Sequence, residues 1–438
     1  MDIAYYMGQV PAYPTFPSVD ALHAELAAVA AAHPELTRIR TIGTSRLGEP
    51  LRVLTVGDGP ADALVIGGPH PNEPIGFRTI TALVDLLCRD AGLRAALGYQ
   101  WHFVACADPD GARLNEGWYG SPGDRRAYAE RFYRPDLAEQ VEWTFPLTVG
   151  DYRFERTLPE TMALMRLMDE IEPSLVCSLH NGEHQGAFYY LNRDDAALAR
   201  QLADLAAFEG LPSHHGEPEV PGSRLIAPSV YSTPAGADMG PAFGAGAGSA
   251  DYAARFGALH LVAEVPLWTD ARVADRTGTG IAYRHLVATT TAARREVFAM
   301  LETALHAVAD DLTIRSPFRR SAEGTLQTFR TFAKHTEHAE GPALPDRPAT
   351  VAEQYDHRQG VHLVRLRLLG AFLRMLDAEI AAGNPTPAIR TQRALLAEHF
   401  DRWVAEAEAD TSGMQVEVRK PVAVQLGAIL LAAQVGVA

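Results

Sequence analysis

The 438-residue chain has 47% hydrophobic and 21% charged residues, a profile typical of a soluble globular protein with two or three domains. Its formal net charge of −15 excludes a broad basic surface for nucleic acid. The N-terminus lacks the basic and long apolar stretches of a secretory signal, and Cys88, Cys106 and Cys177 fit no disulfide or zinc-finger spacing. We therefore expect a cytoplasmic protein with reduced thiols.

Strand and helix patterns alternate over residues 1–312, which we predict to form one α/β domain. The predicted strands lie at 37–45, 50–59, 63–68, 99–107, 174–179, 188–192 and 259–266, and the predicted helices at 18–32, 74–90, 159–171, 194–208 and 282–310. The strands in the middle of this pattern are apolar almost throughout, which is typical of strands covered on both faces by helices.

The composition changes after residue 312. Residues 313–349 are polar and irregular, which predicts a linker, and residues 350–438 carry helical patterns at 350–382 and 386–409. The first helix is apolar over more than one face, and the run 422–438 is apolar but too short to suggest a membrane span. We therefore predict a helical C-terminal region that forms a homo-oligomer. A lid over an active site is the competing interpretation.

A histidine and a glutamate are three residues apart in "GGPHPNEPIG" (67–76), where a predicted strand turns into a predicted helix. A second histidine, His180, ends the strand at 174–179. Ligands often gather at the carboxyl ends of strands in open α/β sheets, so His70, Glu73 and His180 could meet at one edge. Two histidines and a glutamate form a common catalytic zinc site.

The segment "HNGEH" (180–184) offers a rival zinc motif. It fits the H-x-x-E-H pattern, which requires a helix to bring both histidines to one face. Gly182 lies inside this segment and a strand precedes it directly, which disfavours a helix. His184 is then a loop residue near the site.

Glu264 interrupts the apolar strand "HLVAEVP" (260–266). A carboxylate in such a strand is costly unless it is paired or lies beside a metal. The residue is therefore either one half of a salt bridge or the general base that takes a proton from a zinc-bound water.

These segments together resemble the metallocarboxypeptidase family with the carboxypeptidase A fold. The matching segments are His70-x-x-Glu73, "DPDG" (108–111), "SLH" (178–180) and "AEVP" with Glu264, and the resemblance covers roughly residues 15–305. It implies a mixed, twisted sheet of about eight strands between helices. It also implies one zinc ion held by His70, Glu73 and His180, with Glu264 as the general base.

The resemblance further implies residues that contact the substrate. Arg113 would stabilise the oxyanion, and Arg134 would bind a terminal carboxylate, with Arg125 and Arg126 as neighbouring alternatives. The remaining substrate-binding residues implied are Asn115 in the same segment as Arg113, Phe243 in place of a mobile tyrosine, and Ala250, beside Asp251, at the position that sets side-chain preference.

We thus predict a zinc-dependent hydrolase of the metallocarboxypeptidase type, which cleaves an amide bond adjacent to a free carboxylate. A zinc deacylase or amidase acting on an N-acyl amino acid would use the same residues. A non-catalytic assembly protein is the third interpretation, but His70, Glu73, His180 and Glu264 are all present, which counts against it.

Overall fold

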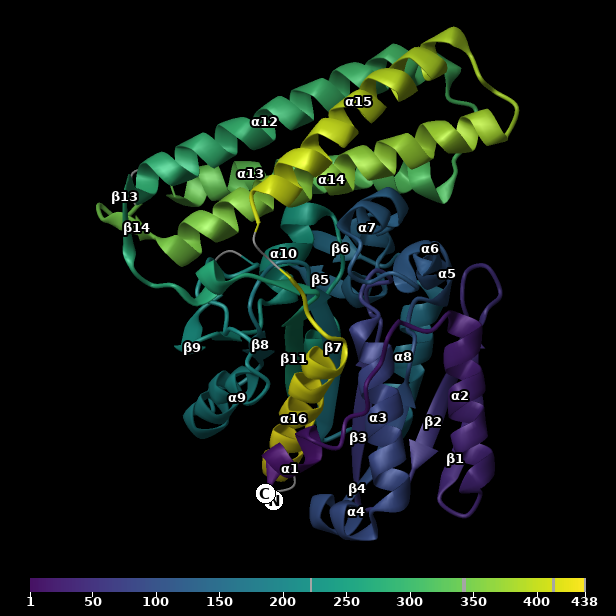
Figure 1. Cartoon of the computed structure of the whole chain (residues 1–438). Helices are drawn as coiled ribbons and strands as arrows, with labels where there is room; N and C mark the ends of the chain where they lie inside the picture. Colours follow the sequence, from purple (N-terminus) through teal and green to yellow (C-terminus); the bar gives the residue numbers. More distant parts are fainter. Residues whose placement is uncertain (221–222, 341–343, 412–413, 437–438) are drawn as a thin grey trace.

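In the computed structural model, which describes residues 1–220, 223–340, 344–411 and 414–436, a nine-stranded mixed sheet forms the centre of the molecule (Figure 1). The strands, in the spatial order β1-β2-β4-β3-β7-β11-β8-β10-β9, are Thr37–Thr44 (β1), Pro50–Val56 (β2), Tyr99–Val104 (β4), Ala61–Gly67 (β3), Leu175–Gly182 (β7), Leu259–Pro266 (β11), Phe188–Leu191 (β8), Val230–Ser232 (β10) and Leu225–Ala227 (β9). The α/β class and the mixed sheet are confirmed. The sheet has nine strands rather than eight, and β9 and β10 are too short to show an alternating pattern.

The middle of the sheet is parallel. Strand β3 pairs in parallel with β4 and β7, and β7 pairs in parallel with β11. The carboxyl ends of β3, β7 and β11 therefore meet at one edge. The pairing of β7 with β11 sets Glu264 directly beside His180.

Helices cover both faces of the sheet. In β3, Ala63 and Val65 belong to the core with helix α3 (Ile75–Arg89), whereas Leu64 and Ile66 face the opposite core, against helix α8 (Pro159–Ile171). The apolar strands seen in the sequence are thus covered on both faces, as predicted. The other helices around the sheet are Ile3–Met7 (α1), Val19–Ala32 (α2), Ala91–Leu97 (α4), Pro109–Arg113 (α5), Glu116–Tyr119 (α6), Arg125–Arg131 (α7), Ala196–Phe208 (α9), Gly236–Phe243 (α10) and Ser249–Ala253 (α11).

The first turn of α3 lies unusually close to β7. A Cβ atom on Gly76 would lie 2.9 Å from the Cβ of Leu179, so a larger residue would push the helix away from the strand. This close packing holds the turn that carries Glu73 beside the residue that follows Leu179, which is His180.

Four long helices form a separate layer over the carboxyl ends of the strands, as Figure 1 shows. They are Tyr283–Val308 (α12), Pro317–Glu340 (α13), Val351–Ala381 (α14) and Pro387–Ala409 (α15), and they enclose their own apolar core. Three two-stranded ribbons complete the fold: Leu147–Val149 with Tyr152–Phe154 (β5, β6), Trp268–Thr269 with Met414–Gln415 (β12, β15) and Gly278–Ala282 with Pro348–Thr350 (β13, β14).

The prediction of a linker at 313–349 was wrong, because most of this range is helix α13. Residues 341–343 of the range lie outside the described residues. The apolar residues Phe318, Ala322, Leu326 and Phe329 recur every three or four positions and pack against the core of the helical layer, while arginine and threonine residues between them make the segment look irregular.

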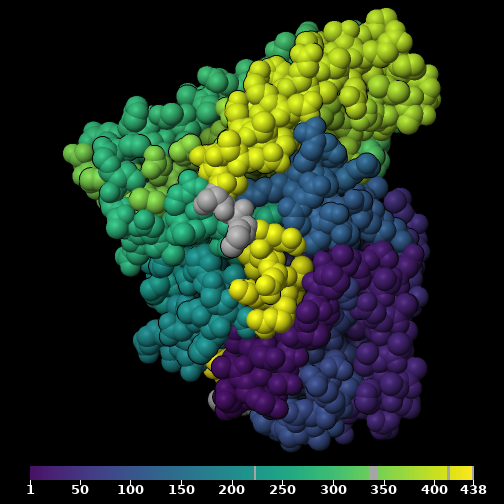
Figure 2. Space-filling model, viewed as in Figure 1, coloured from purple at the N-terminus to yellow at the C-terminus, as the bar shows by residue number. Residues whose placement is uncertain are grey.

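Helix α16 (Arg419–Gly436) corrects the prediction that residues 350–438 form one helical unit. It leaves the helical layer and returns to the sheet, where it packs against α3, α9 and β11 (Figures 1 and 2). Its residues 421–433 are all buried, so the apolar run that led us to expect a homo-oligomer is packed within the chain. Residues 437–438 lie outside the described residues. Among the helices that the structure describes, none is long and apolar enough to cross a membrane.

Candidate metal centre

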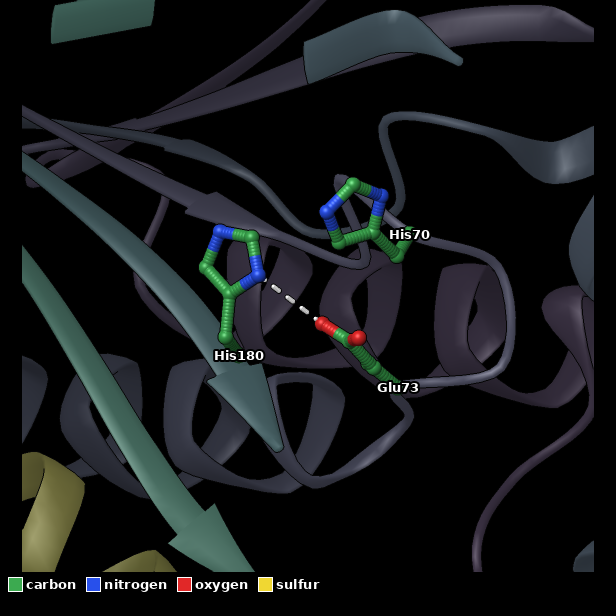
Figure 3. A group of neighbouring side chains, drawn as sticks. All are labelled: His70, Glu73 and His180. Carbon is green, nitrogen blue, oxygen red and sulfur yellow. Dashed lines mark ion pairs between the residues drawn. The ribbon is translucent and has the colours of Figure 1, made fainter. Parts of the chain in front are cut away.

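Three side chains converge at the carboxyl ends of β3 and β7. His70 and Glu73 lie in the turn between β3 and α3, His180 lies near the end of β7, and Figure 3 shows the three pointing toward one another. The Nδ1 atom of His180 is 2.9 Å from Oε2 of Glu73, and one nitrogen or oxygen atom of each of the three residues lies within 4.8 Å of the others. All three residues are buried. The structure thus brings together the residues predicted to hold the metal.

The two histidines differ in their electrostatic surroundings. Burial, together with the positive charges of Arg134 and His180, holds the pKa of His70 well below its usual value. Burial also acts to lower the pKa of His180, but the carboxylates of Glu73 and Glu142 outweigh it and raise the pKa. His70 is therefore neutral at ordinary pH, as a metal ligand must be.

The donor set fits a zinc ion. Within the described part of the chain, the buried Nδ1 of His70 has no hydrogen-bond partner, and such an atom costs about 1–3 kcal/mol. The Oγ atom of Ser178 lies 3.0 Å from Nε2 of His180 and so fixes the ring with Nδ1 toward Glu73. Two imidazoles and one carboxylate are a standard catalytic zinc set.

Glu264 lies beside this group. Its Oε1 is 3.7 Å from Nδ1 of His180. Burial is the main cause that raises the pKa of Glu264 well above its usual value, and the carboxylates of Glu219 and Glu73 add to it. The structure therefore supplies a buried carboxylate next to the three candidate metal ligands, where a general base would have to be.

The rival motif at 180–184 is not formed. Strand β7 continues to Gly182, so the segment is not helical. His184 points elsewhere, with its Nε2 atom 3.4 Å from Oδ1 of Asp356 on α14.

A cavity opens beside the candidate metal ligands, and Arg134 lines it together with His70, His180 and Glu264. The Nη1 atom of Arg134 is 3.0 Å from Oε1 of Glu73. The alternatives Arg125 and Arg126 do not line this cavity. Arg125 lies over the ring of Trp268, and Arg126 pairs with Glu130 and Asp401.

The structure contradicts the role predicted for Arg113. Its Nε atom is 2.6 Å from Glu49 and its Nη2 atom 2.8 Å from Asp20, in a partly exposed position away from the cavity wall. Arg113 is the last residue of the short helix α5, which directs it toward α2 rather than toward the metal ligands.

Asn115 and Phe243 also differ from their predicted roles. Asn115 is fully buried and is bonded to the backbone, since Nδ2 donates to the carbonyls of Gly111 and Tyr133 and Oδ1 accepts from the amide of Tyr133. It therefore shapes the segment before Arg134 instead of touching substrate. The ring of Phe243 lies outside the cavity, with its centroid 4.2 Å from that of Phe332.

Ala250 and Asp251 both line the cavity. The carboxylate of Asp251 accepts hydrogen bonds from the amides of Gly236 and Gly248, so backbone groups already satisfy it. Ala250 is small and uncharged, and its role in side-chain preference stays a prediction.

Several residues of this cavity were missed in the sequence. His260 lies four residues before Glu264 on β11, so the two side chains are on the same face of the strand. The Nε2 atom of His260 lies 3.0 Å from Oγ of Ser249, which donates to Glu142. The alternation along β11 could have identified His260. Glu219, Arg367 and the residues from α13 carry no local motif that would have identified them.

Comparison with known proteins finds similarity over part of the chain. Residues 22–212 match the family described as zinc carboxypeptidase. The carboxypeptidases D of Anas platyrhynchos and Homo sapiens are each 25% identical to the chain over 211 and 210 residues, which is 42% of this chain and 14% of the length of each relative. The solved carboxypeptidase A from Helicoverpa armigera is similar at 15% identity with a TM-score of 0.42, covering 58% of this chain and 65% of that one.

Proposed function

We propose, from the match of residues 22–212 to the family described as zinc carboxypeptidase, that this chain is a zinc-dependent hydrolase that cleaves an amide bond next to a free carboxylate. The single observation that carries the proposal is the convergence of His70, Glu73 and His180, with Glu264 beside them, at one edge of the sheet. Glu264 lies outside the range that matches the family and still reaches the site.

The proposed chemistry divides between the metal and the protein. Zinc, when bound by His70, Glu73 and His180, supplies Lewis acidity toward the scissile carbonyl and the attacking water. Glu264 accepts the proton of that water and delivers it to the leaving nitrogen. Burial raises the pKa of Glu264, which makes its carboxylate a stronger proton acceptor.

Arg134 supports the preference for a substrate with a carboxylate. It lines the cavity and its guanidinium is directed toward the metal ligands through the contact with Glu73. A guanidinium is suited to bidentate binding of a carboxylate. Peptides and N-acyl amino acids both present an amide next to a carboxylate, so both belong to the substrate class proposed.

The first prediction tests the metal. We expect about one zinc per chain by elemental analysis, the stoichiometry of a mononuclear site. His180→Ala should lose most of the zinc, whereas His184→Ala, altered four residues away, should keep it because His184 contacts Asp356 instead. If His184→Ala loses its zinc and His180→Ala keeps it, the assignment of His180 as a zinc ligand is contradicted.

The second prediction tests the base. Glu264→Gln should keep its zinc and its fold but lose hydrolysis of short peptides and N-acyl amino acids by about 10²–10⁴-fold, the usual contribution of a general base. Near-normal turnover by this variant would remove Glu264 from the mechanism. The parent protein should lose the same activity on treatment with a chelator and regain it with zinc.

A further inference from the structure

Part of the wall of the metal-site cavity comes from the helical layer. Helix α13 contributes Thr325, Thr328, Phe329 and Phe332, and helix α14 contributes Arg367. We refer to these five residues as the roof. They follow the range that matches the zinc carboxypeptidase family by more than a hundred residues.

The two helices that carry the roof, α13 and α14, are fixed on one side to the segment that carries Arg134. The hydroxyl of Ser321 on α13 donates to the carbonyl of Arg134 at 2.5 Å, and Arg374 on α14 donates to the carbonyl of Phe132 at 3.0 Å. A Cβ atom on Gly324 would lie 2.4 Å from the Cβ of Asp136, so α13 is in direct contact with this segment.

The helical layer is also fixed on the side of β7. The Nη2 atom of Arg367 lies 2.5 Å from Oε1 of Glu183, three residues after His180. The hydroxyl of Tyr283 on α12 donates to Oε1 of Glu217 at 2.6 Å, in the loop that brings Glu219 to the cavity. Contacts on two sides make the helical layer a fixed part of the site, not an appendage that docks optionally.

The roof gives the cavity an apolar side. Phe329 and Phe332 line it together with Trp143 and Met239, and the ring of Phe243 supports Phe332 from behind. His70, His180, Glu264 and Arg134 supply polar groups to the same cavity. A substrate that fills this space has an apolar group at one end and a carboxylate at the other.

We propose that the roof restricts this enzyme to short substrates, of the size of a dipeptide or an N-acyl amino acid, that place an apolar group against Phe329 and Phe332. Longer polypeptides would have to pass through the space that α13 occupies. The substrate class rests on the proposed function, but the size limit can be measured by binding alone.

The test uses the full-length Glu264→Gln protein loaded with zinc, so that ligands bind without turnover. Three ligands share one C-terminal residue: its N-benzoyl derivative, its N-acetyl derivative and a decapeptide that ends in it. By calorimetry we expect the benzoyl compound to bind about tenfold or more tighter than each of the others, since even one methylene in an apolar pocket is worth about 10-fold or more. Equal binding of the decapeptide and the benzoyl compound would overturn the proposal, as would a lack of binding by all three.

A double variant, Phe329→Ala with Phe332→Ala, tests the roof itself in the same background. It should lose the preference for the benzoyl group and bind the decapeptide more tightly than the parent does. The matched control is Leu326→Ala, which removes a buried side chain of the same helix that faces the core of the helical layer instead of the cavity. If Leu326→Ala changes the preferences as much as the double variant, the effect is one of packing and the roof has no role in selection.

The two proposals fail in different ways. Suppose that Glu264→Gln binds the short ligands with the expected preference but the wild-type protein hydrolyses none of them. The proposed function is then refuted, and the proposed role of the roof in ligand selection stands. A wild-type protein that hydrolyses the decapeptide as efficiently as the benzoyl compound keeps the proposed function and refutes the roof.

Discussion

His260 is a fully buried histidine that lines the metal-site cavity. Its Nε2 atom lies 3.0 Å from Ser249, and its Nδ1 atom has no hydrogen-bond partner among the described residues. Burial, with a smaller effect of His180, lowers the pKa of His260 from 6.5 to about 3. The folded protein thus holds this imidazole neutral at pH values where the unfolded chain protonates it.

The third prediction follows from that difference. Between about pH 6.5 and about pH 3 the unfolded chain binds one more proton at residue 260 than the folded chain does, so acid removes stability over this range. One such group accounts for up to about 1.4 kcal/mol per pH unit. In His260→Gln, which retains a donor for Ser249, the free energy of unfolding should fall less steeply from pH 7 to pH 5 in urea titrations.

The control for His260 is His285→Gln, which alters an exposed histidine on α12. The slope of its unfolding free energy against pH should match that of the parent protein. If His260→Gln also follows the parent slope, the buried imidazole does not contribute to acid sensitivity.

The fourth prediction separates the two arginines that the sequence placed at the site. Arg134→Ala should raise KM for substrates with a free carboxylate and leave amidated substrates little changed, the pattern for a contact made in both ground and transition states. Because Arg134 also pairs with Glu73, zinc content is measured in parallel. Arg113→Ala should leave the kinetics unchanged and cost at most about 1 kcal/mol, because its partners are surface carboxylates. If Arg113→Ala raises KM and Arg134→Ala does not, then Arg113 and not Arg134 contacts the substrate.

At the scale of elements, the sequence predicted those parts of the site whose signal is local. His70, Glu73 and His180 each follow an apolar strand, and strand alternation singled out Glu264. Arg113 was misplaced because the motif says nothing of the direction in which the end of α5 points. The range 313–349 was misjudged because α13 buries only a narrow stripe among polar residues, and its partners lie on α14 and on the segment before Glu139.

Helix α16 links the end of the chain to the two strands that carry His180 and Glu264. The Nε2 atom of Gln425 donates to the carbonyl of His180 at 2.7 Å and to that of Ala263 at 3.1 Å, while its Oε1 accepts from Thr79 on α3 at 2.7 Å. The side chain is fully buried. A glutamine that interrupts an apolar run in the sequence thus becomes a bridge between three elements.

The fifth prediction concerns this bridge. Gln425→Leu keeps the volume of the side chain roughly constant but removes its three hydrogen bonds and leaves the Thr79 hydroxyl without this acceptor. We expect a loss of about 1–3 kcal/mol in the free energy of unfolding. Gln434→Leu on the same helix alters an exposed residue whose amide donates to the carbonyl of Leu430 one turn before it, so it should have little effect. Equal effects of the two changes would contradict the bridge.

At the scale of the whole molecule, the helical layer and the sheet are joined through the site. Arg367 on α14 and Glu183 after β7 form a buried ion pair, which Tyr128 completes by donating to the same oxygen of Glu183. Burial acts to lower the pKa of Arg367, but Glu183 outweighs it, so the pair is charged. The two layers therefore meet in a contact that neither partner can lose without leaving a buried charge.

That geometry gives the last prediction. Removing one partner of a buried pair costs about 3–5 kcal/mol, because the other charge is left uncompensated, whereas replacing both partners with apolar residues costs far less. Arg367→Met should therefore destabilise the protein strongly, and Arg367→Met combined with Glu183→Leu should recover much of that loss. Denaturant unfolding of the single and double variants measures the coupling. Additive losses in the double variant would mean that the pair does not join the layers, and that the helical layer is held over the sheet by its other contacts, among them Ser321 with Arg134.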